Sequence, residues 1–258
     1  MKPIDVILIG GQSNAVGCTN IDTLDVCLRD FVYPTVSLYE EGNFAPYYLN
    51  KIMKGIKCGM GHSATQMGIE YGIANRLSHA TDKEIGLIRY AYGGTTLFLQ
   101  WQTEYEKEPC VLDDKGYCYH NFIKTVQNGL QSYRDNGYEP VIKGMAWMQG
   151  ETDANSEEMA TVYETNMKTL FAKIRETLAL PTLKIIVGEI ATQKEYAPYS
   201  DEIRRIQKKV CDEDSHCVFL STKDIPIGAD GFHFDGNEDF ILGKRFGDYI
   251  INNLEIFL

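Results

Sequence analysis

The sequence lacks any apolar run of about twenty residues, the length that a membrane-spanning helix requires. We therefore predict that the chain does not span a membrane. It also lacks a pair of cysteines at Cys-x-x-Cys spacing, and its 7 cysteines are an odd number. Both facts argue against a zinc knuckle or a redox motif. A pool of reduced thiols is the simplest interpretation, although Cys110 with Cys118, or Cys211 with Cys217, could form a disulfide in an exported protein.

Basic residues are also scarce. The chain has 25 lysines and arginines against 36 aspartates and glutamates, which gives a net charge of -11 and a pI near 5.0. Such a surface repels phosphates, so we predict no nucleic-acid partner. Residues 1–5 lack the apolar core of a signal peptide. We expect a cytoplasmic protein unless a leader has been removed.

The order of elements predicts one α/β domain over residues 1–258. No linker rich in proline, glycine or serine interrupts the chain, and no internal repeat is present. Strand-like and helix-like segments alternate, which predicts a parallel sheet with helices on both faces. The predicted strands cover residues 5–9, 35–39, 86–91, 141–148, 183–190 and 217–220, the helices cover residues 66–79, 121–133, 157–178, 201–210 and 237–252, and residues 42–63 and 103–119 are expected to be mainly irregular.

A serine follows the first predicted strand at once. The apolar residues 5–9 end in Gly10 and Gly11, and Gln12, Ser13 and Asn14 come next. Glycines there permit tight turns and let a substrate approach Ser13 closely. The segment is typical of a nucleophile presented at the carboxyl end of a buried strand. Taken alone, the serine could equally be a turn or helix-cap residue, or the glycines could bind a phosphate.

A serine nucleophile needs a neighbouring base, and histidine is the usual one. Of the 5 histidines, only His233 lies in a segment that also supplies a nearby acid and glycine, with Asp230 three residues before it. An aspartate in that place can fold back onto the imidazole and fix its tautomer. The leading hypothesis is a triad of Ser13, His233 and Asp230. The alternative is an Asp-Gly turn without catalytic function.

Polar residues follow two further predicted strands. Residues 86–91 lead into Gly93 and Gly94, and residues 141–148 lead into Gln149 and Glu151. Such residues lie where α/β folds place their active sites, at the carboxyl edge of the sheet. A glycine amide and the Gln149 side chain, with the Ser13 amide, are donors that could hold the oxyanion of a tetrahedral intermediate. The alternative for Gly93 and Gly94 is a tight turn without catalytic function.

These segments resemble the motif blocks of the SGNH hydrolases, in the branch of the sialate O-acetylesterases and related acetylxylan esterases. The blocks are Gly-Gln-Ser-Asn at residues 11–14, Gly-Gly-Thr at 93–95, Trp-Met-Gln-Gly-Glu-Thr-Asp at 147–153 and Asp-Gly-Phe-His at 230–233. They stand in the family's order and span nearly the whole chain. The resemblance implies a flavodoxin-like three-layer α/β/α sandwich and a serine esterase that acts on O-acetylated carbohydrates without a metal or other cofactor.

The resemblance also implies a role for each site residue. Ser13 would be the nucleophile, His233 the base and acid, and Asp230 its partner, with Glu151 as a second candidate for that acid. Ser13, Gly94 and Gln149 would form the oxyanion hole.

The substrate contacts are less defined by the sequence. Gln12, Asn14 and Trp101 are the candidates, although Asn14 could instead hold the Ser13 loop, and Trp101 could belong to the core rather than stack on a sugar. His62 is ambiguous and is more typical of an exposed loop. The partner we expect is an acetylated carbohydrate or another small ester. The alternatives are a general short-chain carboxylesterase or thioesterase, and a non-catalytic carbohydrate-binding protein, and the oligomeric state stays open.

Overall fold

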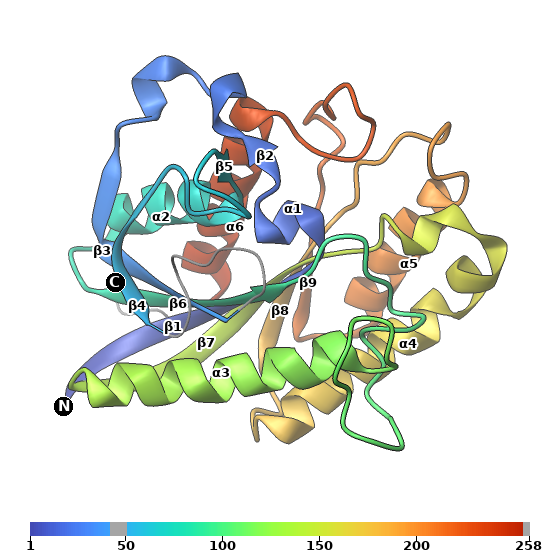
Figure 1. Cartoon of the computed structure of the whole chain (residues 1–258), viewed down its shortest axis with the longest axis horizontal. Helices are drawn as coiled ribbons and strands as arrows, with labels where there is room; N and C mark the ends of the chain where they lie inside the picture. Colours follow the sequence, from blue (N-terminus) through green and yellow to red (C-terminus); the bar gives the residue numbers. More distant parts are fainter. Residues whose placement is uncertain (42–50, 255–258) are drawn as a thin grey trace.

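A seven-stranded sheet runs through the centre of the molecule, in the order β4-β3-β6-β1-β7-β8-β9. The computed structural model describes residues 1–41 and 51–254 (Figure 1). The strands of this sheet are β1 (Lys2–Gly11), β3 (Val32–Glu40), β4 (Ile52–Lys57), β6 (Ile85–Ala91), β7 (Tyr138–Met148), β8 (Lys184–Gly188) and β9 (Cys217–Leu220). A second, two-stranded sheet pairs β2 (Thr19–Asn20) with β5 (Gln66–Met67).

Helices cover both faces of the large sheet (Figure 1). One apolar core lies between the sheet and helices α3, α4 and α5, and the other lies between the sheet and helices α1, α2 and α6. The predicted three-layer α/β/α arrangement is therefore confirmed. The helices are α1 (Ser13–Val16), α2 (Ile69–Ala80), α3 (Tyr117–Asp135), α4 (Glu157–Thr177), α5 (Ser200–Glu213) and α6 (Gly236–Asn253), and short 3-10 turns lie at Ile21–Thr23, Val26–Leu28 and Asp153–Asn155.

The strand order places a topological switch point beside β1. Strands β3-β6-β1-β7-β8-β9 are parallel, and β1 lies between β6 and β7. After β1 the chain runs to β3, on the β6 side of the sheet, and returns through β6 before it crosses β1 to β7. In open α/β sheets, ligands bind at the carboxyl ends of the strands at such a point. This is the edge where β1 delivers Ser13.

The sequence-based prediction missed three strands: β4 of the large sheet, and the two-residue strands β2 and β5, of which β5 lies at the start of the predicted helix 66–79. Strand β4 lies within residues 42–63, which were expected to be irregular, and it pairs antiparallel with β3 at the edge of the sheet. The sheet is thus mostly rather than wholly parallel. Residues 42–50 of the same predicted segment lie outside the described residues. Helix α3 begins four residues earlier than predicted, within the expected irregular stretch of residues 103–119.

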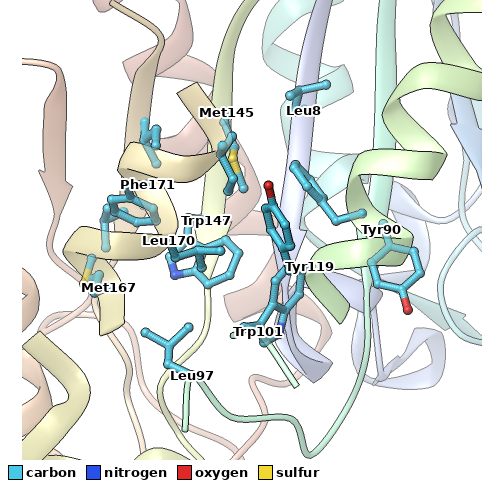
Figure 2. Close-up of a cluster of buried hydrophobic side chains, with 14 of the residues drawn as sticks. Leu8, Tyr90, Leu97, Trp101, Tyr119, Met145, Trp147, Met167, Leu170 and Phe171 are labelled. Atoms are coloured by element: carbon cyan, nitrogen blue, oxygen red, sulfur yellow. The ribbon is translucent and has the colours of Figure 1, made fainter. Parts of the chain in front are cut away.

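Trp101 belongs to the core, so its predicted stacking on a sugar is wrong. It is 1% exposed, and its ring lies edge-on to Trp147 with 4.8 Å between centroids. Figure 2 shows both rings within the cluster of apolar side chains under α3 and α4. The indole nitrogen donates a hydrogen bond to Thr95 Oγ1 at 3.1 Å, which satisfies its only polar atom. Trp101 is therefore packed against Trp147 in the core and is not exposed at the surface.

Two further findings concern the described residues. None of their helices is both long and apolar enough to cross a membrane. All seven cysteines lie among these residues and are free thiols, so neither Cys110–Cys118 nor Cys211–Cys217 is a disulfide in this structure.

A buried ionic cluster joins the sheet to α2. Arg89 on β6 is fully buried, and its guanidinium lies 2.8 Å from a carboxylate oxygen of Glu40 and 2.8 Å from one of Glu70. It also donates a hydrogen bond to the Met60 carbonyl at 2.6 Å. The two carboxylates and the carbonyl compensate the arginine for its lost hydration, as a buried charge requires.

Asp239 on α6 is buried near this cluster without a partner of its own. Neither of its carboxyl oxygens makes a hydrogen bond within the described part of the chain. Burial, together with the nearby Glu70 carboxylate, raises the pKa of Asp239 well above its ordinary value, and Arg89 only partly opposes this. Burial therefore favours the neutral form of this carboxyl in the folded protein.

We predict that this proton makes the fold less stable as the pH rises. The unfolded chain releases it near pH 4, whereas the folded chain retains it, so the free energy of unfolding falls by about 1.4 kcal/mol per pH unit from there up to the folded pKa. Asp239→Asn removes this contribution. In urea unfolding at pH 5, 7 and 8.5, the variant should gain stability relative to wild type with each step. A constant difference between the two proteins would show that Asp239 is ionised in the fold.

Candidate active site

Ser13 lies where β1 ends and α1 begins. The preceding residues are fixed by both neighbouring segments, because Gln12 donates its backbone N–H to the Met148 carbonyl at 2.9 Å and Tyr92 donates to the Gly11 carbonyl at 3.2 Å. Ser13 is 8% exposed, and its hydroxyl makes no hydrogen bond to any described residue. The serine therefore presents an uncommitted hydroxyl at the carboxyl edge of the sheet.

Asp230 and His233 form a compact turn before α6. His233 Nδ1 lies 2.6 Å from Asp230 Oδ2. The other carboxylate oxygen accepts the backbone N–H groups of Phe232 and His233, each at 2.8 Å. Partial burial opposes ionisation of Asp230, but these two N–H groups and the imidazole outweigh it and hold the pKa of the carboxyl below its usual value. The aspartate is an ionised partner that can orient the ring and stabilise an imidazolium.

Asn14 connects this turn to the serine. Its side-chain Nδ2 donates to the Phe232 carbonyl at 3.0 Å and to Glu151 Oε1 at 2.8 Å. The two bonded residues Asn14 and Phe232 are chain neighbours of Ser13 and His233, so the predicted nucleophile and base are held on adjoining segments. Ser13 and His233 share no hydrogen bond in the structure. Such bonds often form or tighten only when a substrate is present.

Glu151 follows β7, and its carboxyl group is hydrogen-bonded to Asn14 rather than to His233. It is buried, and its second oxygen, Oε2, has no hydrogen-bond partner among the described residues. Burial raises the pKa of Glu151, while the Asn14 hydrogen bond and the nearby His233 act in the opposite direction. Of the two acids that the sequence left as candidates, the one bonded to the imidazole is Asp230.

The loop after β6 passes close to the serine. A Cβ on Gly93 would lie 3.6 Å from Ser13 Cβ, whereas one on Gly94 would meet nothing within 4 Å. Gly94 has a φ of +73°, which favours glycine there. Within residues 1–41 and 51–254, the backbone N–H groups of Ser13, Gly93 and Gly94 have no hydrogen-bond acceptor. They are the free donors that an oxyanion hole requires.

Gln149 does not supply such a donor, so this part of the predicted oxyanion hole is wrong. Its side chain is fully buried, and its Nε2 donates to Asp153 Oδ2 at 2.5 Å and to the Thr95 carbonyl at 3.1 Å. Both hydrogens of the amide are therefore used inside the protein. The bond to Thr95 fixes the residue that follows Gly94, so Gln149 supports the glycine loop from below.

Gln12 and Asn14 also support the site rather than contact a substrate, which corrects the predicted role of Gln12 and agrees with the alternative predicted for Asn14, holding the Ser13 loop. Gln12 is buried, with Nε2 donating to Thr152 Oγ1 at 3.2 Å and Oε1 accepting from the Gly150 backbone at 3.2 Å. Asn14 is buried as well, and both of its N–H groups are used as described above. His62 is half-buried, and its backbone N–H donates to the carbonyl of Gly17, just after α1.

The sequence-based analysis missed Asp153 as part of the site. Its two carboxylate oxygens accept the backbone N–H groups of Leu97 at 3.1 Å and Phe98 at 3.2 Å, in addition to the Gln149 amide. Burial raises the pKa of Asp153 to about 7, although these donors favour the carboxylate. Its place at the end of the Trp-Met-Gln-Gly-Glu-Thr-Asp block was the signal that could have identified it.

A family model described as "Carbohydrate esterase, sialic acid-specific acetylesterase" matches residues 3–252. Among individual proteins, the chain is similar to a probable carbohydrate esterase of Arabidopsis thaliana. The two are 29% identical over 270 residues, which cover 98% of this chain and 92% of that protein.

Solved structures with low sequence identity show the same fold. The crystal structure of the Arabidopsis protein aligns with a TM-score of 0.74 at 21% identity and covers 97% of this chain and 99% of that one. The structure of NanS aligns with a TM-score of 0.70 at 15% identity, with 98% of each chain covered. Est24, a carbohydrate acetylesterase from Sinorhizobium meliloti, aligns with a TM-score of 0.55 at 14% identity, covering 96% of this chain and 99% of that one.

The match to the family model extends from β1 to the last turn of α6 and includes every segment that builds the site. The chain belongs to the family of carbohydrate esterases described as sialic acid-specific acetylesterases, and it is a carboxylic ester hydrolase.

Proposed function

We propose that the protein is a serine esterase that removes O-acetyl groups from carbohydrates, with Ser13 as nucleophile, His233 as general base and acid, and Asp230 as the partner of His233. The observation that carries the proposal is the hydrogen bond from Asn14 to the Phe232 carbonyl. It holds the Asp230–His233 pair against the segment that presents the serine. The hydrogen bond from Thr19 Oγ1 to the Phe234 carbonyl, at 2.9 Å, joins the same two segments on the other side of His233.

Acylation begins when Ser13 Oγ attacks the carbonyl carbon of the acetyl ester. The free ring nitrogen of His233, Nε2, takes the hydroxyl proton, and the ionised Asp230 stabilises the imidazolium through Nδ1. The negative oxygen of the tetrahedral intermediate is stabilised by the uncommitted N–H groups of Ser13 and of the Gly93–Gly94 loop. When the intermediate collapses, the sugar oxygen leaves with the proton from His233, and Ser13 carries the acetyl group.

Deacylation repeats these steps with water. His233 takes a proton from the water as the oxygen attacks the acetyl-serine, and the same amides stabilise the second intermediate. The bond to Ser13 Oγ breaks, acetate leaves, and His233 returns its proton to the serine. The whole cycle thus has four proton transfers, two in each half, and all of them pass through His233.

The family description and the names of the similar acetylesterases support acetyl as the acyl group and a carbohydrate as the alcohol. The two rival functions differ from this proposal in different respects, one in the acyl group and the other in turnover. A short-chain carboxylesterase or thioesterase would keep the triad and accept other acyl groups. A carbohydrate-binding protein would keep the fold without turnover.

The proposed function leads to a prediction about the substrate. We expect acetylated xylan or O-acetylated sialic acid to give the highest kcat/KM in a panel that also contains aryl esters of acyl chain length two to eight and an acetyl thioester. Ser13→Ala should lower kcat by roughly 10⁴- to 10⁶-fold on every active substrate, because no other side chain replaces the nucleophile. The measurement is the release of acetate or of the aryl alcohol at pH 7.5.

Different outcomes of the panel would contradict different parts of the proposal. Equal rates for acetyl, butyryl and octanoyl esters would indicate a general carboxylesterase. Binding of acetylated sugar without turnover, unchanged by Ser13→Ala, would indicate a non-catalytic protein.

A further prediction tests which of the two acids, Asp230 or Glu151, is the partner of His233. Asp230→Asn should lower kcat by roughly 10³- to 10⁴-fold, since an amide cannot stabilise the imidazolium or fix the required tautomer. Glu151→Gln should stay within about tenfold of wild type, because Glu151 acts through one hydrogen bond to Asn14. Asp235→Asn is a matched control: the residue is exposed, lies two positions after His233 and occupies the N-cap position of α6, where its side chain makes no capping hydrogen bond that the change could remove. A larger loss for Glu151→Gln than for Asp230→Asn would reverse the assignment.

A further inference from the structure

Two aromatic side chains lie together beside the Asp230–His233 turn. The rings of Tyr196 and Phe232 have centroids 5.4 Å apart and planes inclined by 54°. Tyr196 is 50% exposed, and Phe232, the residue before His233, is partly exposed. The Tyr196 hydroxyl makes no hydrogen bond within the part of the chain that the structure describes. Together the two rings present apolar surface and a free hydroxyl next to the catalytic histidine.

The backbone is arranged to hold Tyr196 in this place. Gly231 has a φ of +75°, and a Cβ on it would lie 2.3 Å from Tyr196 Cδ2. Only glycine therefore lets the tyrosine ring lie against the turn. The two loops are also bonded directly, because Gln193 donates its backbone N–H to the Gly231 carbonyl at 3.1 Å and its own carbonyl accepts the Tyr196 N–H at 3.1 Å. Gly231 and the Gln193 backbone bonds therefore hold the exposed Tyr196 ring in a defined position.

We propose that Tyr196 and Phe232 form a platform that binds the sugar ring of the substrate while its acetyl group faces Ser13. This inference rests on the proposed function and names the residues that recognise the carbohydrate. One face of a pyranose ring carries mainly C–H groups, which an aromatic ring covers well because it offers a large rigid apolar surface. The free Tyr196 hydroxyl is available to a sugar hydroxyl at the edge of that face.

The position of the platform agrees with the geometry of the reaction. The leaving sugar oxygen takes its proton from His233, so the sugar must lie on the histidine side of the scissile bond. Phe232 precedes His233 in the chain, and Tyr196 contacts Phe232 and Gly231. Trp101, which the sequence suggested for sugar stacking, is in the core and has no face to offer.

The test compares a sugar ester with an ester that has no ring. The substrates are a mono-O-acetylated methyl xylopyranoside and ethyl acetate, with acetate release measured for both. Tyr196→Ala should raise KM for the sugar ester about tenfold, with kcat within about twofold, and should leave kcat/KM for ethyl acetate unchanged. Tyr196→Phe should retain most of the sugar affinity, and Tyr196→Leu, which keeps apolar bulk against Gly231, should behave like the alanine variant.

Phe31→Ala is the matched control. This phenylalanine is 52% exposed and immediately precedes β3, at the amino edge of the parallel strands and opposite the serine. It should leave both substrates unaffected. Binding of the sugar ester to Ser13→Ala, measured by calorimetry with and without Tyr196→Ala, provides an affinity that does not depend on turnover.

Two results would overturn the platform. Equal losses on the sugar ester and on ethyl acetate, in both the alanine and leucine variants, would mean that Tyr196 only supports the histidine turn. An unchanged KM and affinity for the sugar ester would mean that the sugar lies elsewhere. Failure of the proposed function is a separate result: wild-type protein would then hydrolyse the sugar ester no better than ethyl acetate, or not at all, before any variant is compared.

Discussion

The site depends on the two hydrogen bonds that the Asn14 amide donates. One ends on the Phe232 carbonyl and the other on Glu151, so one side chain joins the nucleophile segment, the histidine turn and the segment after β7. A typical hydrogen bond contributes only about 1 kcal/mol to stability. These two matter more than that, because Glu151 is buried and Asn14 is its side-chain donor, and a buried carboxylate without donors is costly. Separating the segments would remove the side-chain donor of the buried Glu151, and this cost holds the segments together.

A second buried network holds the other half of the site. The Gln149 amide bonds to Asp153 and to the Thr95 carbonyl, and Asp153 in turn accepts the N–H groups of the following loop. This network holds the loop that contains Gly93 and Gly94, whose N–H groups have no acceptor among the described residues. Donors that are fixed before the reaction stabilise a developing charge without any reorganisation. The buried polar side chains are thus used to position backbone groups, and the backbone groups are available for the chemistry.

The sequence predicted the central strands of the sheet well and the edge strand β4 poorly. The buried parts of strands such as β1 and β7 are apolar runs that end in glycine or polar residues, so their pattern is unambiguous. Strand β4 instead contains Gly55 and two lysines and is only half covered, which is typical of an edge strand and resembles a loop in sequence. Helix α3 was predicted too short because its first turn begins in polar and aromatic residues that show no clear period. These failures concern elements whose structure is decided by neighbours rather than by their own residues.

The site residues divide in the same way. Ser13, His233 and Asp230 could be proposed from the sequence because a nucleophile, a base and its partner have few alternatives in residue type. A buried glutamine or asparagine amide can point to a substrate or to the backbone, and nothing in a sequence decides between them, so Gln12, Asn14 and Gln149 were given contacts with the reacting ester that they do not make. Tyr196 shows the converse, since it belongs to none of the motif blocks and lies in a loop whose fixed shape depends on Gly231. The motif blocks of this chain therefore specify the framework that performs ester hydrolysis, and the side chains that choose the ester have to be sought on the loops that this framework holds in place.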